Sequence, residues 1–350
     1  MDLDDLSTIK NLDKGNALGS VRMIKDQVRA AWDEAYAVNF PESYKDIDNI
    51  IIAGMGGSAY GGRIIKSLFD TADTSRIPVE LANGYKLPGY VSKKTLVFLC
   101  SYSGTTEETI ACGLEALNKG VKLSGITSGG ELGKLLKSHG LPAYIFNSQY
   151  NPSKQPRIGV GYMVVGLIAM LSKLGFLPIK KQEIDDTYSF LQKSLSEHDQ
   201  IAKDFAHRLS QQIPIIIVAD ILEGAAHAIR NPFNETAKQF ATYYVVSELN
   251  HHLMEGLQFP EIAKDIFRFI FIESDLYYHR NRKRMLLTRQ VVGKNHYKTD
   301  VITLRGTTPF MQTMELIQLG NLITVYLALL HNIDPSPVPW VDYFKKELNK

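Results

Sequence analysis

The fold is decided at residues 49–62, which read NIIIAGMGGSAYGG. The apolar run Asn49–Ala53 has the length of a strand, and a strand that is apolar throughout suits a parallel sheet covered by helices on both faces. The turn that follows, from Gly54 to Gly62, contains five glycines, and residues 63–69 predict a helix after it. A strand, a tight turn and a helix in this order form the repeating unit of a doubly wound α/β domain.

The same unit recurs along the first half of the chain. Further strands are predicted at residues 95–100, 122–127 and 143–146, and a helix is predicted at residues 110–117. Strand–turn–helix units in series describe one parallel sheet with helices on its faces.

The second half repeats this architecture after a helical connection at residues 157–174 and 184–210. The run IIIVADILEGAA, which begins at Ile215, aligns with IIIAGMGGSA, which begins at Ile50, so the chain carries two copies of one subdomain. The turns of the second copy are poor in glycine and serine, which assigns anion binding to the first. Strands of the second copy are predicted at residues 214–220, 267–273 and 298–304.

We therefore expect an α/β protein with two doubly wound subdomains, each a parallel sheet flanked by helices. The predicted segments are an N-terminal subdomain with leading helices at 1–152, connecting helices at 153–211, and a C-terminal subdomain with a tail at 212–350. A core helix is expected at residues 316–330. Residues 334–340 are too rich in proline for a helix, so a last helix is expected from Val341.

Composition excludes several classes of protein. A length of 350 residues suits two domains, and 39 Lys and Arg against 37 Asp and Glu leave no global charge that would recruit nucleic acid or an anionic membrane. Two cysteines exclude a disulfide scaffold and favour the cytoplasm. The N-terminus, MDLDD, lacks the pattern of a signal peptide, and the uncharged stretches 158–171 and 316–330 fall short of a membrane span.

Hydroxyl side chains gather where the strand 95–100 should meet the next helix. Backbone N–H groups at the start of a helix lack partners and carry a positive dipole, so hydroxyls there complete a neutral cradle for phosphate. A single hydroxyl would more simply cap the helix. A dinucleotide also stays open, because Glu80 is expected near the end of its strand, although Ala59 replaces the third glycine of the fingerprint. The predicted phosphate-binding residues are Gly56, Gly57, Ser58, Ser101, Ser103 and Thr106.

Motifs in both halves resemble one family. GMGGSA at 54–59 and SYSGTTEET at 101–109 strongly resemble the SIS (sugar isomerase) domain. Later segments narrow the resemblance, over nearly the whole chain, to the bifunctional phosphoglucose/phosphomannose isomerase family. They are QPRIGVGY at 155–162, NE at 234–235, ELNH at 248–251 and DPSP at 334–337. The resemblance implies two SIS subdomains, a hexose 6-phosphate substrate, a homodimer, and no required metal or other cofactor.

An aldose–ketose isomerase needs a base beside C2, an acid/base group at the ring oxygen and a cation for the developing charge. Glu235 is the predicted base: Asn234 would cap a helix that Glu235 begins, and the dipole there favours a carboxylate. Arg157 is the predicted cation, because guanidinium stays charged. Ser336 stands where the family usually has threonine, a hydroxyl thought to help the site accept both epimers.

His251 is the predicted ring-opening residue, because imidazole exchanges protons near neutrality. It follows Glu235 by 16 residues, which in one continuous helix would separate the two by about 24 Å. Either the chain folds back before Ser247, or His251 completes the site of a neighbouring subunit, as the resemblance implies. His252 stands where the family usually has asparagine, so the choice between the two imidazoles stays open.

A rival interpretation is a sugar-phosphate-sensing SIS module without catalysis. It would need the serine-rich turn but not Glu235, His251 or Arg157. The nine histidines show no ligand spacing such as H-E-x-x-H, so no metal is expected. The basic run 279–284 is expected to be a solvated face, and Tyr243 and Tyr244, which are at helical spacing, are expected in the core.

Overall fold

The strands form two separate sheets, and every strand pair in both sheets is parallel. The computed structural model describes residues 2–70, 77–348 and 350; Met1 and residues 71–76 of the predicted first segment lie outside this range. The first sheet has the order β2-β1-β3-β4-β5. Its strands are β1 (Asn49–Gly54), β2 (Val79–Ala82), β3 (Thr95–Cys100), β4 (Lys122–Thr127) and β5 (Ala143–Ile145).

The second sheet repeats the order of the first with one strand fewer. Its order is β7-β6-β8-β9, so β6 takes the place of β1 and β8 that of β3. The predicted duplication is therefore confirmed. The strands are β6 (Ile213–Val218), β7 (Thr242–Val245), β8 (Phe267–Glu273) and β9 (Lys298–Thr303).

β7 was not predicted, and the helical spacing expected for its two tyrosines is wrong, although both pack against the core. Tyr243 and Tyr244 lie on this strand beside β6, not on a helix, and both are half-buried. Glu80 is the second residue of β2, not near its end. β7 has only four residues, all half-buried, and so short a segment does not distinguish a strand from a helix by its pattern.

Helices cover the first sheet on both faces. Its core is continuous with that of the helices, since Ile50, Ile52 and Phe98 of the sheet are fully buried with Ile168 of α7. The helices of this part of the chain, up to residue 173, are α1 (Leu6–Leu12), α2 (Ala17–Arg22), α3 (Ile24–Tyr36), α4 (Tyr60–Asp70), α5 (Glu107–Lys119), α6 (Gly130–Ser138) and α7 (Val160–Lys173), with short 3₁₀ turns η1 (Glu42–Lys45) and η2 (Gly56–Ala59).

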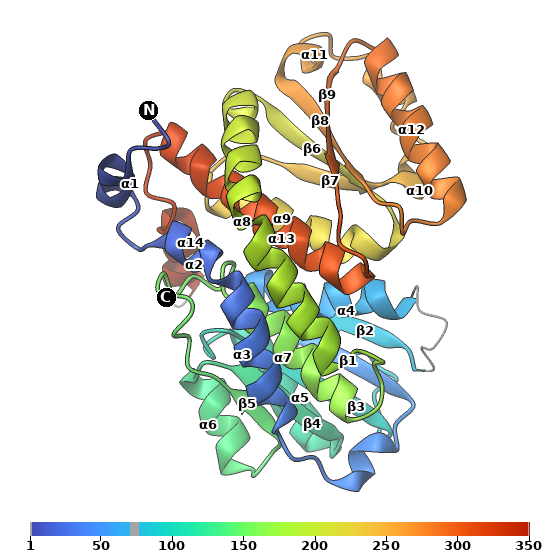
Figure 1. Ribbon diagram of the computed structural model, residues 1–350. Helices are drawn as coiled ribbons and strands as arrows, with labels where there is room; N and C mark the ends of the chain where they lie inside the picture. Colours follow the sequence, from blue (N-terminus) through green and yellow to red (C-terminus); the bar gives the residue numbers. More distant parts are fainter. Residues whose placement is uncertain (1, 71–76, 349) are drawn as a thin grey trace.

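Two long helices connect the sheets. α8 (Lys181–Leu209) packs along α13 (Pro309–Leu330), and Figure 1 shows both running between the lower, first sheet and the upper, second sheet. α13 is long and apolar enough to cross a membrane, but 94% of its most apolar window is buried inside the protein. It is therefore the central core helix, seven residues longer at its start than the prediction of 316–330.

The remaining helices surround the second sheet, and α9 faces the first. α9 packs on α4, where the backbone of Arg63 and Ile64 comes so close to Gly224 that a Cβ would lie 2.5 Å from Ile64 Cα. These helices are α9 (Glu223–Glu235), α10 (Val246–Leu249), α11 (Ala263–Ile266) and α12 (His279–Lys294), with η3 (Asp220–Leu222) and η4 (Glu255–Leu257).

Asp220 lies in the turn after β6, where the first subdomain has its glycine-rich turn after β1. Its backbone has a φ of +32°. Its carboxylate accepts hydrogen bonds from the side chain of Asn281 and from the N–H of Tyr278, the N-cap of α12. The start of α12 in the second subdomain is thus filled by a carboxylate of the protein.

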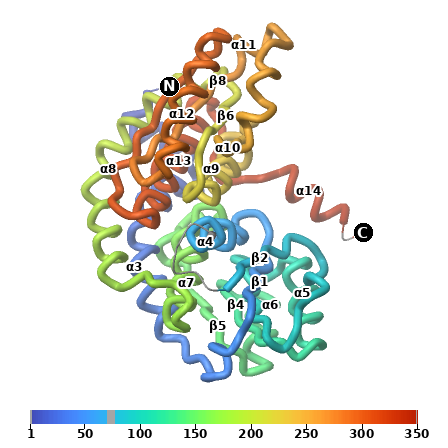
Figure 2. The backbone as a smooth tube through the Cα atoms, turned by 90° about the vertical axis from the view of Figure 1, so that its right-hand side faces the viewer, coloured from blue at the N-terminus to red at the C-terminus, as the bar shows by residue number. Residues whose placement is uncertain are grey.

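The chain ends in α14 (Pro339–Leu348), which begins two residues before the predicted Val341. Proline suits this first helical position because its missing N–H has no partner there anyway. None of its residues is buried, and Figure 2 shows α14 projecting from the body of the molecule.

Candidate active site

The two predicted phosphate-binding turns lie together at the carboxyl ends of β1 and β3. Ser58, in the turn after β1, accepts a hydrogen bond of 2.8 Å from the backbone N–H of Tyr102, in the turn after β3. Gly56 has a left-handed backbone with a φ of +50°, and a side chain there would meet nothing within 4 Å. The first turn therefore faces open space beside the second.

The hydroxyls of the second turn are ordered by one another at the start of α5. Ser101 Oγ and Thr106 Oγ1 are 2.8 Å apart, and Ser103 Oγ and Thr105 Oγ1 are 2.9 Å apart. Thr106 is the N-cap of α5, but its side chain makes no capping bond. Because Thr106 does not cap the helix and Ser103 is exposed, the first N–H groups of α5 and the Ser103 hydroxyl are suited to an anion.

Arg157 lies beneath these turns and links them to the second subdomain. It precedes α7 instead of beginning it, and its side chain is 1% exposed. A Cβ on Gly57 would lie 2.9 Å from the backbone nitrogen of Arg157, so only glycine allows the turn to come this close. Burial lowers the pKa of Arg157, and the nearby Glu235 carboxylate opposes that shift.

The guanidinium of Arg157 is held by four hydrogen bonds of 2.8 Å. Nε donates to Thr236 Oγ1, and Nη1 donates to Gln155 Oε1. Nη2 donates to the backbone oxygens of Pro335 and Ser336. A guanidinium has five N–H groups, so one Nη1 hydrogen remains on the side of Glu235.

Glu235 ends α9 and does not begin a helix, so the predicted cap by Asn234 is wrong. α9 continues through Pro232, and Asn234 donates to the backbone oxygens of Arg230 and Ala241. The negative end of the helix dipole faces Glu235, which disfavours its carboxylate. Burial raises its pKa; the nearby cations, Arg157 foremost, oppose that shift. Glu235 Oε2 lies 3.7 Å from Arg157 Nη1.

Ser336 joins this cluster through its backbone. Its oxygen accepts from Arg157, and its N–H donates to Asp334 Oδ1 at 2.9 Å. The Ser336 hydroxyl is buried, and among the described residues it has no hydrogen-bond partner. A Cβ on Gly15 would lie 2.3 Å from it, so α1 and α2 are joined by a segment that passes over this hydroxyl.

His251 and His252 lie elsewhere. The chain between Glu235 and His251 is not one helix, because β7 and α10 intervene. Both imidazoles are exposed after α10, and His251 lines a cavity of about 520 Å³ between α10 and α12. The basic run that begins α12 is mostly exposed, as predicted, and Arg284 lines the same cavity. The structure therefore gathers Gly57, Arg157, Glu235 and Ser336 but not the histidines.

Three further residues belong to the cluster and were not predicted. Thr236 is buried and receives Arg157 Nε. Lys238 donates to the backbone oxygens of Thr236, Asp334 and Pro335. Tyr60 is fully buried at the start of α4, and burial, followed by the charge of Glu235, raises its pKa. The one available signal was adjacency, since Thr236 and Lys238 closely follow Glu235 in the sequence.

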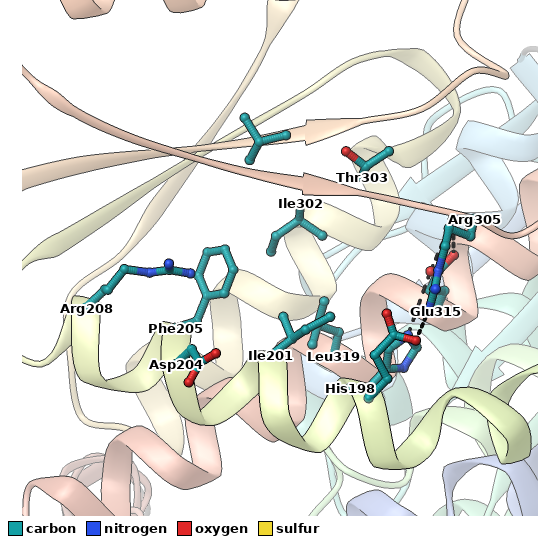
Figure 3. A pocket seen from close by; sticks show the side chains of 12 residues that line it. His198, Ile201, Asp204, Phe205, Arg208, Ile302, Thr303, Arg305, Glu315 and Leu319 are labelled. Atoms are coloured by element: carbon teal, nitrogen blue, oxygen red, sulfur yellow. Dashed lines mark hydrogen bonds and ion pairs between the residues drawn. The ribbon is translucent and has the colours of Figure 1, made fainter.

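A second cavity, of about 290 Å³, lies between α8, β9 and α13, away from this cluster. Figure 3 shows His198 and Glu315 close together in it, with His198 Nε2 3.8 Å from Glu315 Oε1. Glu315 accepts from the backbone N–H groups of Arg305 and Gly306, and Arg305 pairs with Glu197. The charged groups of this cavity therefore pair with one another or with the backbone, and they hold α8, β9 and α13 together. No group of three or more potential metal ligands occurs among the described residues.

Comparisons with known proteins agree with this architecture. Residues 198–348 match the model for the bacterial phospho-glucose isomerase C-terminal SIS domain. The crystal structure of a hypothetical protein from Thermus thermophilus superposes with a TM-score of 0.74 at 15% identity, over 97% of this chain and 91% of that one. That likeness shows the fold, and together with the family-model match it identifies two SIS-type α/β subdomains.

Two curated relatives span nearly the whole chain. The bifunctional phosphoglucose/phosphomannose isomerase of Caldicellulosiruptor bescii is 30% identical over 94% of this chain and 98% of its own length. That of Thermoplasma volcanium is 33% identical over 93% of this chain and 97% of its own length. With this identity over this coverage, the chain belongs to the bifunctional phosphoglucose/phosphomannose isomerase family.

Proposed function

We propose that this protein reversibly isomerises glucose 6-phosphate, and also mannose 6-phosphate, to fructose 6-phosphate. The observation that carries the proposal is the ion pair between Arg157 and Glu235, which lies next to the hydroxyl-rich turns of the first subdomain. A carboxylate beside a fixed cation is what proton transfer next to a carbonyl needs. The phosphate would bind at Ser58, Ser101, Ser103 and Thr106, with Gly56 and Gly57 giving the backbone access.

The proposed reaction moves one proton within the open-chain sugar. Glu235 removes the proton from C2, the electron pair forms the C1–C2 double bond, and O1 takes the negative charge of a cis-enediolate. The O2 hydroxyl proton passes to O1, and Glu235 returns its proton to C1, which leaves a carbonyl at C2. Arg157 stabilises the enediolate through its fixed charge and its remaining Nη1 hydrogen.

The proposed site draws on all three predicted segments. The phosphate cradle comes from residues 1–152, Arg157 from residues 153–211, and Glu235 and Ser336 from residues 212–350. We place Ser336 in the site as a residue that shapes the turn over Arg157. The presence of a base and a cation beside the cradle favours catalysis over a sensing module.

We further propose a homodimer in the cytoplasm, in which His251 of a second copy opens the sugar ring. Two observations support this: His251 is exposed, and it lines a cavity whose walls include none of the described residues of the Arg157 cluster. Ring opening needs a group that gives a proton to the ring oxygen and takes one from the C1 hydroxyl, which imidazole does near neutrality.

A coupled assay with glucose 6-phosphate and mannose 6-phosphate tests the proposal. Conversion of both sugars to fructose 6-phosphate is expected from the purified chain. Binding without conversion at every pH from about 6 to 9 would make the protein a sensor. For the dimer, a mixture of Glu235→Gln and His251→Ala chains should recover activity that neither parent has. No recovery would overturn the shared site, and repeating the mixture with His252→Ala tells which imidazole acts.

A further inference from the structure

The loop that follows Glu235 contains a lysine in an unusual conformation. Lys238 has a left-handed backbone with a φ of +53°. A residue with a Cβ adopts this conformation only at an energetic cost, whereas glycine does so freely. The side chain of Lys238 must therefore offer something that glycine would not.

That side chain reaches the carboxyl-terminal tail. Lys238 Nζ lies 3.3 Å from each of three backbone oxygens, those of Thr236, Asp334 and Pro335. Pro335 also accepts from Arg157 Nη2. The Pro335 carbonyl thus lies between two cations, and the ammonium joins the tail, at Asp334 and Pro335, to its own loop at Thr236.

Nearby acids offset the repulsion between the cations Arg157 and Lys238. Partial burial, followed by the charge of Arg157, lowers the pKa of Lys238 to about 8. The carboxylates of Asp334 and Glu235 oppose this shift. Part of the residue remains exposed. The ammonium is thus charged at neutral pH and lies at the edge of the Arg157–Glu235 cluster.

We propose that Lys238 is a positioning residue of this site: together with Arg157 it holds the turn Asp334–Ser336 against the loop after Glu235. A second consequence follows from its charge, because Lys238 favours the ionised form of Glu235. The groups that face Glu235 are Tyr60, Arg157, Arg230, Lys238 and Lys345. This inference rests on the proposed function for its kinetic part only.

The kinetic test compares Lys238→Met, Lys238→Arg and the control Lys346→Met, which removes an exposed lysine of α14. With glucose 6-phosphate, we expect Lys238→Met to lower kcat about tenfold, which corresponds to about 1.4 kcal/mol, with less than a threefold change in KM. The acidic limb of its pH–kcat profile should move to higher pH, because Glu235 has lost a cation. Lys238→Arg should restore most of kcat and the original limb.

A loss of kcat without a shift of the acidic limb would mean a purely structural role and would overturn the inference, as would a Lys238→Met profile equal to that of Lys346→Met. Lys238→Asn guards against misfolding, because asparagine tolerates the left-handed backbone. It should show the same loss as Lys238→Met.

A second measurement does not depend on turnover. Hydrogen–deuterium exchange of the peptide that contains residues 333–338 should be faster in Lys238→Met than in Lys346→Met. Equal exchange would overturn the positioning role. If the wild-type chain converts neither sugar but exchange still rises in Lys238→Met, the proposed function fails while the role of Lys238 in holding the tail stands.

Discussion

The guanidinium of Arg157 and the carboxylate of Glu235 lie 3.7 Å apart, although the first precedes α7 and the second ends α9. Arg157 is almost fully buried, whereas the side chain of Glu235 is 31% exposed. The cation is therefore fixed by the protein, and the carboxylate keeps one side open to a substrate. The difference in exposure suits Arg157 as a fixed cation and Glu235 as a base that transfers a proton.

Replacing Glu235 with Gln should abolish proton transfer while leaving the fold intact. A general base contributes about 10²–10⁴-fold to a rate, so kcat for glucose 6-phosphate should fall by at least two orders of magnitude. Binding of fructose 6-phosphate, followed by calorimetry, should change by less than a factor of about three. A variant that retains more than a tenth of kcat would assign the proton transfer to another group.

Activity and stability should respond to pH in opposite ways at Glu235. Activity needs the carboxylate, so it should be lost as pH falls through the raised pKa of this group. Folding favours the protonated form, because the folded pKa lies above the unfolded one; this stabilisation is complete below the unfolded pKa and is lost as pH rises through the folded pKa.

Urea unfolding of the wild type and of Glu235→Gln, measured between about pH 4 and 8, checks this. The difference in unfolding free energy should shift in favour of Glu235→Gln as pH rises through that window, because glutamine does not ionise. A difference that is constant with pH would show that the carboxyl titrates alike in both states.

Truncating Arg157 should cost both stability and activity. Arg157→Ala removes the largest cationic influence on Glu235 and the donor to the Ser336 oxygen, and it leaves the Pro335 oxygen with Lys238 alone; breaking a buried charge pair costs about 3–5 kcal/mol. Arg157→Lys keeps the charge but cannot donate in the four directions seen here, so we expect an intermediate loss in urea unfolding. Equal unfolding of Arg157→Lys and the wild type would show that charge, not geometry, matters at this position.

The close approach at Gly57 predicts sensitivity to a single methyl group. Gly57→Ala would set a Cβ 2.9 Å from the nitrogen of Arg157 and 3.0 Å from the carbonyl carbon of Pro156, both backbone atoms. The turn must therefore move away from Arg157, at a cost of about 1–3 kcal/mol. KM for the sugar phosphate should rise about tenfold. Gly84→Ala is the matched control, because its Cβ would meet nothing within 4 Å.

The sequence predicted the sheets better than the site. β3, β4 and β8 lie where predicted, and β3, which is apolar after Thr95 and buried on every residue, shows most directly how a strand buried on both faces is recognised. β7 is half-buried on every residue and has no such pattern. Asn234 has the residue type of an N-cap, yet α9 continues through Pro232 and ends at Glu235, so the prediction placed Glu235 at the wrong end of a helix.

The contacts around Arg157 lay beyond any local pattern. Its partners Thr236 and Ser336 are 79 and 179 residues away in the chain, and the packing of α4 on α7 and α9, together with that of α9 on α13, brings them together. The motif resemblance identified Arg157, Glu235 and Ser336 one by one, without predicting the contacts among them. Lys238 belonged to no motif, and its role depends on where the tail folds back.

The carboxylate of Asp220 at the start of α12 bears on how many ligands one chain can hold. Two subdomains of the same architecture would offer a phosphate two equivalent places. A resident anion already occupies the place in the second subdomain that corresponds to the hydroxyl-rich cradle of the first. The two subdomains therefore differ in their capacity to bind an anion. Titration with a sugar phosphate should saturate at one molecule per chain.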